Sequence, residues 1–365
     1  MINIKGAMLV NGHKCNIQIK DGFIENITAD YIGAGDVISV PEDVYVSPGW
    51  IDLHTHAFPK YKPYCSYPDD IGYKTGVTTV VDAGTCGADD IDELHNIAKS
   101  SKTRVLSLLN ISRTGLKTRN ELADLSLLSY EAFHQAYEKY SDMIVGVKAR
   151  MSGSVIGDNG IKPLEIAKQF AKKINKPLMV HIGSAPPKLA EIVRRLEKGD
   201  IITHCFNEKV GNNIFNKDQS INEAVLRAIE CGVYLDIGHG TSSFSFNIAE
   251  KAKESLVPFH SISTDIYEGN RVNGPVYDMA TTLNKFLKLG YTLSDTIRRV
   301  TEIPAKIINQ PELGKLTVGA RADLTLFKVV DKEMTLVDSL GRKRTSSKVI
   351  EPYAVIVGGH YYTFD

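Results

Sequence analysis

The sequence predicts an α/β fold: a (β/α)8 TIM barrel with a small β-sandwich domain formed from both chain termini. Two observations lead to this prediction. Short apolar runs alternate with helical periods through the middle of the chain, and segments of alternating polarity lie at both ends. Strands that alternate with helices form parallel sheets, and eight such units close a barrel. A chain of 365 residues has room for both parts.

Eight apolar runs follow one another along the central part of the chain. They span residues 49–53, 78–82, 104–109, 144–148, 177–180, 201–203, 233–237 and 261–264. The helical period between them predicts helices over residues 88–100, 120–140, 163–174, 188–197, 222–231, 244–254 and 293–308. This pattern assigns residues 49–309 to the barrel.

The two ends of the chain have β character. Residues 1–48 contain short segments of alternating polarity separated by turn residues, and similar segments return at 322–327 and 354–359. Neither end alone has enough strands to bury an apolar face. We therefore predict that residues 1–48 plus 310–365 form one β-sandwich domain beside the barrel.

Charge and composition narrow the class of partner. Lys plus Arg equals Asp plus Glu at 43 each, so no global field favours nucleic acid or an anionic membrane, and we expect a small-molecule substrate. No apolar run reaches the roughly 18 residues of a membrane span, and the first residues lack the apolar core of a signal peptide. Five scattered cysteines without a C-x-x-C pair argue against a disulfide framework or a zinc ribbon. We expect a cytoplasmic protein.

His54 and His56 directly follow the first apolar run of the barrel. The period of two in a strand puts both side chains on one face, where they point into the barrel mouth. Two imidazoles in that position can share a metal ion. The H-x-H pattern alone is a weak signal, and two buried, hydrogen-bonded histidines are the alternative interpretation.

Further ligand-type residues lie at the C-terminal ends of other predicted strands. Lys148 ends the fourth strand and His181 the fifth, while His204 and Asp265 end the sixth and the eighth. In a parallel barrel these ends converge on one site, although the residues are far apart in the sequence. Together with the first two histidines they predict a metal centre at the C-terminal mouth.

The segments that carry these residues resemble the binuclear amidohydrolases, the group that contains dihydroorotase, hydantoinase and isoaspartyl dipeptidase. The likeness spans the whole chain in order, and it is closest to the predicted amidohydrolase/deacetylase branch, whose members are labelled dihydroorotase-like or adenine deaminase. The motifs are specific for the superfamily and much less so for the substrate. They are PGWIDLHTH, GVTTVVDAGT, VGVKARMS, MVHIGSAPP, ITHCFN and STDIY.

The resemblance implies two divalent metal ions, bridged by an N-carboxylated Lys148. Carboxylation by carbon dioxide turns the lysine cation into an anion with two ligand oxygens; the alternative is a barrel lysine paired with an acid. Zinc suits histidine nitrogen and carboxylate oxygen, although manganese or iron fits the same set. The implied ligands are His54, His56 and Asp265 for a buried ion, and His181 and His204 for a more exposed one.

The activity implied by the resemblance is hydrolysis of an amide or ester bond in a small N-acyl or acyl carboxylic acid, as in a deacetylase. A hydroxide that bridges the two ions would attack the carbonyl, and Asp265 would transfer the proton. A deaminase or cyclic amide hydrolase, of the adenine deaminase or dihydroorotase type, is the alternative. Typical dihydroorotases, however, carry an arginine where this chain has Phe58.

A third interpretation is a non-catalytic barrel used as a scaffold, since fold never guarantees activity. The intact set of six ligand-type residues counts against it. Barrels of this class often self-associate, so a homo-oligomer is a further expectation from the resemblance.

Strand alternation also suggests which residues contact the substrate. Arg150 and Tyr267 each follow a predicted ligand by two residues and so lie on the same side of the chain. Arg150 is the best candidate for binding a substrate carboxylate, with Arg113 as the alternative and a structural salt bridge as another interpretation. Other candidates lie just beyond strand ends: Asn110, Ser152, Ser184, Asn207 and His239.

Overall fold

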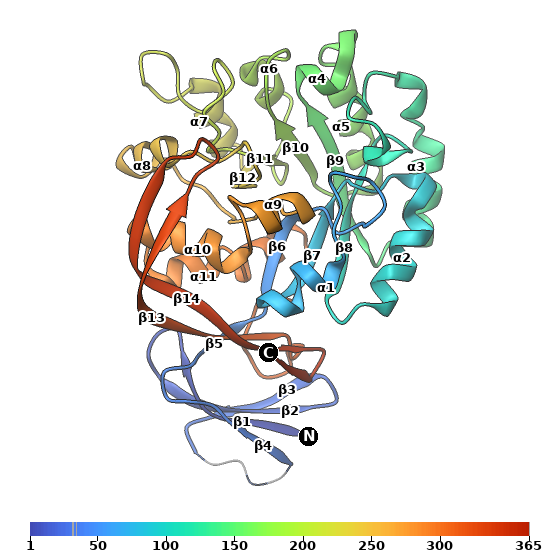
Figure 1. Cartoon of the computed structure of the whole chain (residues 1–365). Coiled ribbons are helices and arrows are strands. Elements are labelled where there is room, and N and C mark those ends of the chain that lie inside the picture. The colour runs from blue at the N-terminus through green and yellow to red at the C-terminus, as the bar shows by residue number, and fades with distance from the viewer. Residues whose placement is uncertain (31–32, 34, 365) are drawn as a thin grey trace.

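The computed structural model describes residues 1–30, 33 and 35–364, and its strands form two separate sheets. Residues 31, 32 and 34 of the predicted N-terminal β unit, and residue 365, lie outside the described residues. Figure 1 shows the barrel next to a β domain that contains the first and the last strands of the chain. The predicted fold class is confirmed.

The barrel sheet has seven parallel strands, and each strand pairs with the next one in the sequence. Successive residues alternate between two cores: Val80 packs between strands and helices, and Val81 packs inside the barrel. The strands are β6 (Trp50–Thr55), β7 (Val77–Ala83), β8 (Arg104–Asn110), β9 (Ile144–Met151), β10 (Leu178–Ile182), β11 (Ile201–Thr203) and β12 (Tyr234–Leu235).

The eighth predicted strand is present as a closing segment, residues 261–266, rather than as a regular strand. It forms isolated parallel bridges to β12 on one side and to β6 on the other, through Asp236↔Ser261 and Thr55↔Ile266. Asp265 has a φ of 51°, so the extended conformation breaks there and a continuous ladder cannot form. The barrel is nonetheless closed between its first and last strands.

Helices cover the outside of the barrel, and several of them differ from prediction. The helix predicted over 120–140 begins only at Tyr130, because the side chain of Ser129 accepts a hydrogen bond from the Ala132 amide and caps it there. The one predicted over 293–308 is interrupted after Arg298. Four helices were not predicted: Pro68–Ile71, Gly153–Ile156, Glu268–Asn273 and Met279–Lys288. The helices are α1 (Pro68–Ile71), α2 (Ile91–Ser100), α3 (Tyr130–Lys139), α4 (Gly153–Ile156), α5 (Lys162–Ile174), α6 (Leu189–Val193), α7 (Glu223–Glu230), α8 (Phe246–Glu254), α9 (Glu268–Asn273), α10 (Met279–Lys288), α11 (Leu293–Arg298) and α12 (Glu302–Ile307).

Both chain ends contribute to the second sheet, because β5 pairs with β13 in antiparallel register. This sheet encloses a core of its own, to which Ile4 and Ile17 contribute from one end and Leu326 and Ile356 from the other. Its strands are β1 (Ile2–Leu9), β2 (Lys14–Lys20), β3 (Phe23–Thr28), β4 (Asp36–Ser39), β5 (Tyr45–Pro48), β13 (Leu324–Val337), β14 (Lys343–Val357) and β15 (His360–Thr363).

Strands β13 and β14 are longer than predicted and extend from the β domain as a hairpin along the barrel (Figure 1). The hairpin packs on α10, where the Asn284 side chain accepts a hydrogen bond of 2.7 Å from the Ile350 amide. Its turn, residues 338–342, lies near the start of α8. No helix in the described part of the chain combines the length and the apolar composition needed to cross a membrane.

Candidate active site

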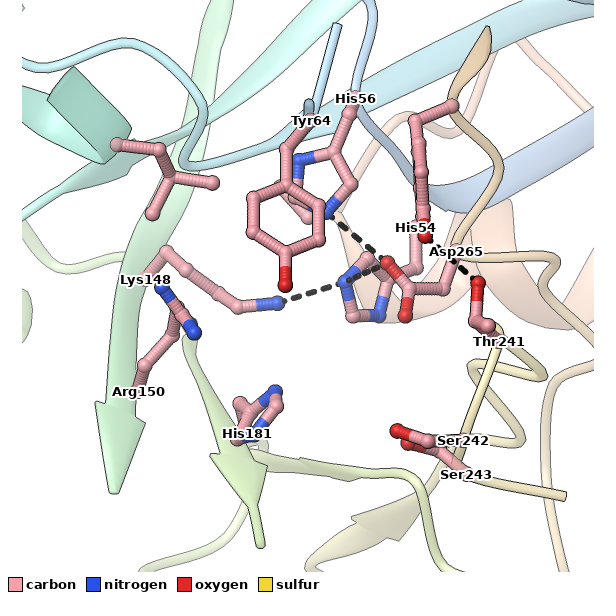
Figure 2. A pocket seen from close by; sticks show the side chains of 13 residues that line it. His54, His56, Tyr64, Lys148, Arg150, His181, Thr241, Ser242, Ser243 and Asp265 are labelled. Carbon is pink, nitrogen blue, oxygen red and sulfur yellow. Dashed lines mark hydrogen bonds and ion pairs between the residues drawn. The ribbon is translucent and has the colours of Figure 1, made fainter. Parts of the chain in front are cut away.

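The six residues predicted as metal ligands lie together at the C-terminal ends of the barrel strands. His54 is in β6 with His56 just after it, and Lys148 and His181 are in β9 and β10. Figure 2 shows these four side chains around one pocket, with Asp265 of the closing segment facing them. The remaining residue, His204, directly follows β11.

Short distances join the donor atoms of this cluster. Asp265 Oδ1 is 2.9 Å from His56 Nε2 and 3.4 Å from His54 Nε2. The ring nitrogens His181 Nδ1 and His204 Nε2 are 2.8 Å apart. One ligand atom each of His54, His204 and Asp265 lies within 4.8 Å of the other two. Nitrogen and carboxylate donors this close together fit divalent metal ions.

Hydrogen bonds on the far side of the rings set the histidine tautomers. The Thr203 hydroxyl donates to Asp236 Oδ2, so its oxygen accepts from His54 Nδ1 at 2.8 Å. The Gly238 carbonyl can only accept, and it does so from His204 Nδ1 at 2.6 Å. Nδ1 therefore carries the proton in both rings, and the Nε2 lone pairs face the cluster. Metal-binding histidines are typically oriented in this way.

The charges of these groups suit metal binding. Burial lowers the pKa of His54 and His181 well below the ordinary value and lowers the pKa of His204 to about 4. Burial by itself would raise the pKa of Asp265, but the hydrogen bond from His56 and nearby positive charges lower it below its ordinary value. At neutral pH these three imidazoles are thus neutral and the carboxylate is ionised, which are the states that bind a cation.

Lys148 is buried beside the histidines, and burial lowers its pKa to about 7. Its Nζ atom is 3.0 Å from His54 Nε2 and 3.3 Å from Met179 Sδ, and it forms no ion pair with any described carboxylate. The alternative interpretation, a lysine paired with an acid, is therefore not supported among the described residues. Gly84, with a φ of +77°, packs against the lysine stem, where a Cβ would come 2.7 Å from Lys148 Cγ. Only glycine fits this close approach.

Two residues of the cluster have unusual backbone conformations. His204 and Asp265 have φ values of 70° and 51°, in the left-handed region that residues other than glycine rarely adopt. Such conformations persist where the surrounding structure enforces them, and they gather at functional sites. The fold thus holds both side chains in place at a cost in backbone energy.

A pocket of about 80 Å³ lies over the cluster, and two of the predicted substrate-binding residues line it. Arg150 Nη1 is 3.1 Å from Glu121 Oε2, and the guanidinium lies over the Tyr64 ring at 5.8 Å. The Tyr267 hydroxyl is 2.7 Å from Thr241 Oγ1. Arg150 thus lines the pocket and also forms the salt bridge with Glu121, and its contact with a substrate carboxylate stays a prediction.

The other candidates do not line the pocket. Arg113 pairs with Asp89 at 2.7 Å and its side chain is 46% exposed. Asn110 and Asn207 are buried and donate to main-chain carbonyls of Gly84 and His204. These side chains complete the hydrogen bonding of turns at the strand ends.

Ser152, Ser184 and His239 also lie outside the pocket lining. The Ser152 hydroxyl donates to the Ser184 carbonyl at 3.4 Å, and the Ser184 side chain is exposed. His239 is fully buried, stacked on Phe244, and its Nε2 is 2.7 Å from Lys285 Nζ. A role for His239 as base or substrate contact would require this packing to open.

Several residues that line or support the pocket were not predicted from the sequence. The run Thr241, Ser242, Ser243 follows the seventh strand closely, and three consecutive hydroxyls near a strand end are a signal that could have been used. Tyr64 lies in a long segment without regular structure after β6, and nothing in its sequence context indicates its position. Glu121, the buried partner of Arg150, was likewise hidden inside a predicted helix.

Comparisons with known proteins show the family of this chain. Residues 316–363 match a family described as a deacetylase-like composite domain. A protein of Enterococcus faecalis named Deacetylase is 46% identical to this chain and covers 98% of each sequence. A Brucella anthropi protein, also named Deacetylase, is 37% identical over 94% of this chain and 86% of its own length.

This chain is also similar to solved structures of amidohydrolases. A structure described as an adenine deaminase has a TM-score of 0.97 and 46% identity, and covers 99% of both chains. A structure described as a dihydroorotase has a TM-score of 0.91 and 32% identity, with 100% of this chain and 98% of that one covered. A D-hydantoinase, at 17% identity and a TM-score of 0.68, shares the fold.

Proposed function

We propose a function for this chain from its family: it belongs to the amidohydrolase superfamily and to the family of the deacetylases above. It hydrolyses an amide or ester bond of a small N-acyl or acyl carboxylic acid. The single observation that carries the proposal is the convergence of four histidines, one aspartate and one buried lysine beneath a small pocket. The pocket volume suits a small molecule rather than a polymer.

We propose two divalent zinc ions as cofactors of this site. The ligands would be His54, His56 and Asp265 for one ion, His181 and His204 for the other, and carboxylated Lys148 for both. When bound, such ions lower the pKa of a water molecule and polarise a carbonyl group. The low pKa of Lys148 supports the carboxylation, because carbon dioxide reacts with a neutral amine.

The residues of the chain supply the proton transfer and the substrate contacts. Asp265 is ionised and lines the pocket, so its carboxylate can accept a proton from water and return it to the leaving nitrogen or oxygen. Arg150 lies on the pocket wall, and the N–H groups of its guanidinium that do not bond to Glu121 can donate to a substrate carboxylate. Tyr64 and Tyr267 line the same space.

Deamination of a cyclic amidine is the second candidate, because a structure at 46% identity is described as an adenine deaminase. The described pocket contains no carboxamide side chain and no acid other than Asp265, so it offers few groups for reading a purine ring. An acyl carboxylic acid matches Arg150 better. We also propose a cytoplasmic location, which the five free cysteines support.

The test is comparative kinetics with metal-loaded protein on N-acyl amino acids, acyl hydroxy acids, dihydroorotate and adenine. We expect the highest kcat/KM for an acylated carboxylic acid, with release of the free acid, and loss of turnover on chelation with recovery on adding zinc or manganese. Ammonia release from adenine at a higher kcat/KM would replace the acyl proposal with deamination. Full turnover in protein free of metal would show that neither acyl hydrolysis nor deamination at this site depends on metal ions.

A further inference from the structure

Three consecutive hydroxyl side chains, Thr241, Ser242 and Ser243, form one wall of the pocket; we call them the hydroxyl wall. In Figure 2 they lie across the pocket from Lys148 and Arg150. The main chain before α8 that carries them forms neither a helix nor a strand. The position of this wall therefore depends on contacts from elsewhere in the molecule.

The hydroxyl wall is tightly coupled to the catalytic carboxylate. Gly240, which precedes it, has a φ of +54°, and a Cβ at this position would come 2.3 Å from Asp265 Oδ2. Thr241 Oγ1 is 2.7 Å from the hydroxyl of Tyr267. A shift of a fraction of an ångström in this segment would thus change the space beside the carboxylate where substrate must sit.

The β domain holds this segment through Ser339, in the turn of the β13–β14 hairpin. The Ser339 hydroxyl accepts hydrogen bonds from the amides of Ser243 at 3.2 Å and Phe244 at 3.1 Å. It donates to the Gly240 carbonyl at 3.1 Å. A serine hydroxyl has one donor and two acceptor sites, so all three sites of Ser339 are used by hydrogen bonds to this segment. The Ser339 amide also donates to the Phe244 carbonyl at 3.0 Å.

Neighbouring contacts keep Ser339 in place. Asp338 accepts from the Phe246 amide at the start of α8 at 3.0 Å. Its other oxygen accepts from the amides of Leu340 and Arg342 and closes the hairpin turn. The Arg342 guanidinium donates to Glu208 at 3.0 Å, in the chain that follows β11. The turn is therefore fixed to the barrel on both sides of Ser339.

We propose that Ser339 is a positioning residue for substrate binding, through which the β domain sets the place of the hydroxyl wall. Without its hydroxyl, the amides of Ser243 and Phe244 and the carbonyl of Gly240 lose a partner, and the segment relaxes toward water. The proposed metal ligands lie on strands, directly after strands or on the closing segment, and none of them bonds to Ser339, so they stay in place. The kinetic consequence rests on the proposed function; the structural one does not.

The kinetic test compares Ser339→Ala with Ser347→Ala, a control at an exposed serine of β14. We expect Ser339→Ala to raise KM about tenfold, the effect of losing one to two hydrogen bonds, while kcat and the metal content per chain stay close to wild type. Ser339→Thr, which keeps the hydroxyl, should restore most of the affinity. Equal KM values in the two alanine variants would overturn the proposal.

Amide hydrogen exchange tests the same proposal without a substrate. In the wild-type protein the amides of Ser243 and Phe244 should exchange slowly, and in Ser339→Ala residues 240–246 should exchange about tenfold faster or more, with the barrel strands unchanged. Exchange of both amides at the rate of an unstructured peptide in the wild type would overturn the proposal, even if the variant fails to fold. Protected amides combined with no acylase activity would leave Ser339 in its role and refute the proposed function alone.

Discussion

Replacing Arg150 by methionine tests its two roles, the salt bridge and the substrate contact. The Glu121 side chain is fully buried and Arg150 is 13% exposed, with Nη1 3.1 and 3.3 Å from the two carboxylate oxygens. Removing one partner of such a pair leaves a buried carboxyl that must either stay charged without compensation or take up a proton, and the loss is about 3–5 kcal/mol of folding free energy. Arg150→Met should therefore destabilise the protein by roughly that amount, in addition to any effect on the substrate.

The buried carboxyl of Glu121 also makes the stability of the protein depend on pH. Burial raises the pKa of Glu121 from 4.5 to about 7, even though Arg150 opposes the shift. A carboxyl whose pKa is higher in the folded state binds more protons there, so stability falls as pH rises from about 4.5 to 7. This shift is equivalent to ~3 kcal/mol. In Arg150→Met the pKa of Glu121 rises further, so stability should continue to fall above pH 7. In Glu121→Gln this decrease in stability with pH should be absent.

Urea unfolding of four proteins separates the contributions: the wild type, Arg150→Met, Glu121→Gln and the double variant. The double variant lacks the uncompensated charge, so it should recover at least half of the stability lost in Arg150→Met. If Arg150 also binds the substrate carboxylate, KM should rise roughly 10- to 150-fold in both variants that lack it, as expected for a charged hydrogen bond of about 1.5–3 kcal/mol. KM should stay near wild type in Glu121→Gln.

Two outcomes would refute this reasoning separately. A wild-type KM in the double variant would make Arg150 a structural residue only. Wild-type stability of Arg150→Met at pH 8, with an unchanged pH profile, would show that Glu121 is better solvated than its burial indicates.

The remaining predictions concern the proposed metal centre. Lys148→Ala should abolish turnover and lower the metal content measured by elemental analysis, and a short carboxylic acid added with excess metal should restore part of both; an unmodified Lys148 in an experimental map of metal-loaded active protein would contradict this. Asp265→Asn should keep the fold and much of the metal but lose several orders of magnitude in kcat, because an amide can neither accept the proton nor return it. Near wild-type kcat in that variant would require another base.

The cluster of predicted metal ligands could be located from the sequence, because residues at the ends of successive parallel strands come together in a barrel. His54 and His181 are far apart in the chain, but each stands at the C-terminal end of a strand, and all such ends meet at one mouth. The hairpin of β13 and β14 could not be located in the same way. Its outer part is largely exposed and lacks an apolar alternation, and its position depends on contacts such as Asn284 with Ile350.

The predicted substrate-binding residues differ in how well the sequence located them. The period of two along a strand located pocket-lining residues, and polarity near a strand end did not. Arg150 and Tyr267 were placed by counting two residues from a ligand, and both line the pocket. Asn110, Asn207 and His239 were chosen only for being polar and near a strand end, and each is buried instead. Where a strand ends, the chain turns, and its freed amides and carbonyls need partners. A short polar side chain at such a turn bonds to the backbone, as Asn207 does to the His204 carbonyl. A position two residues after a predicted ligand is therefore a better indicator of a pocket-lining side chain than polarity near a strand end.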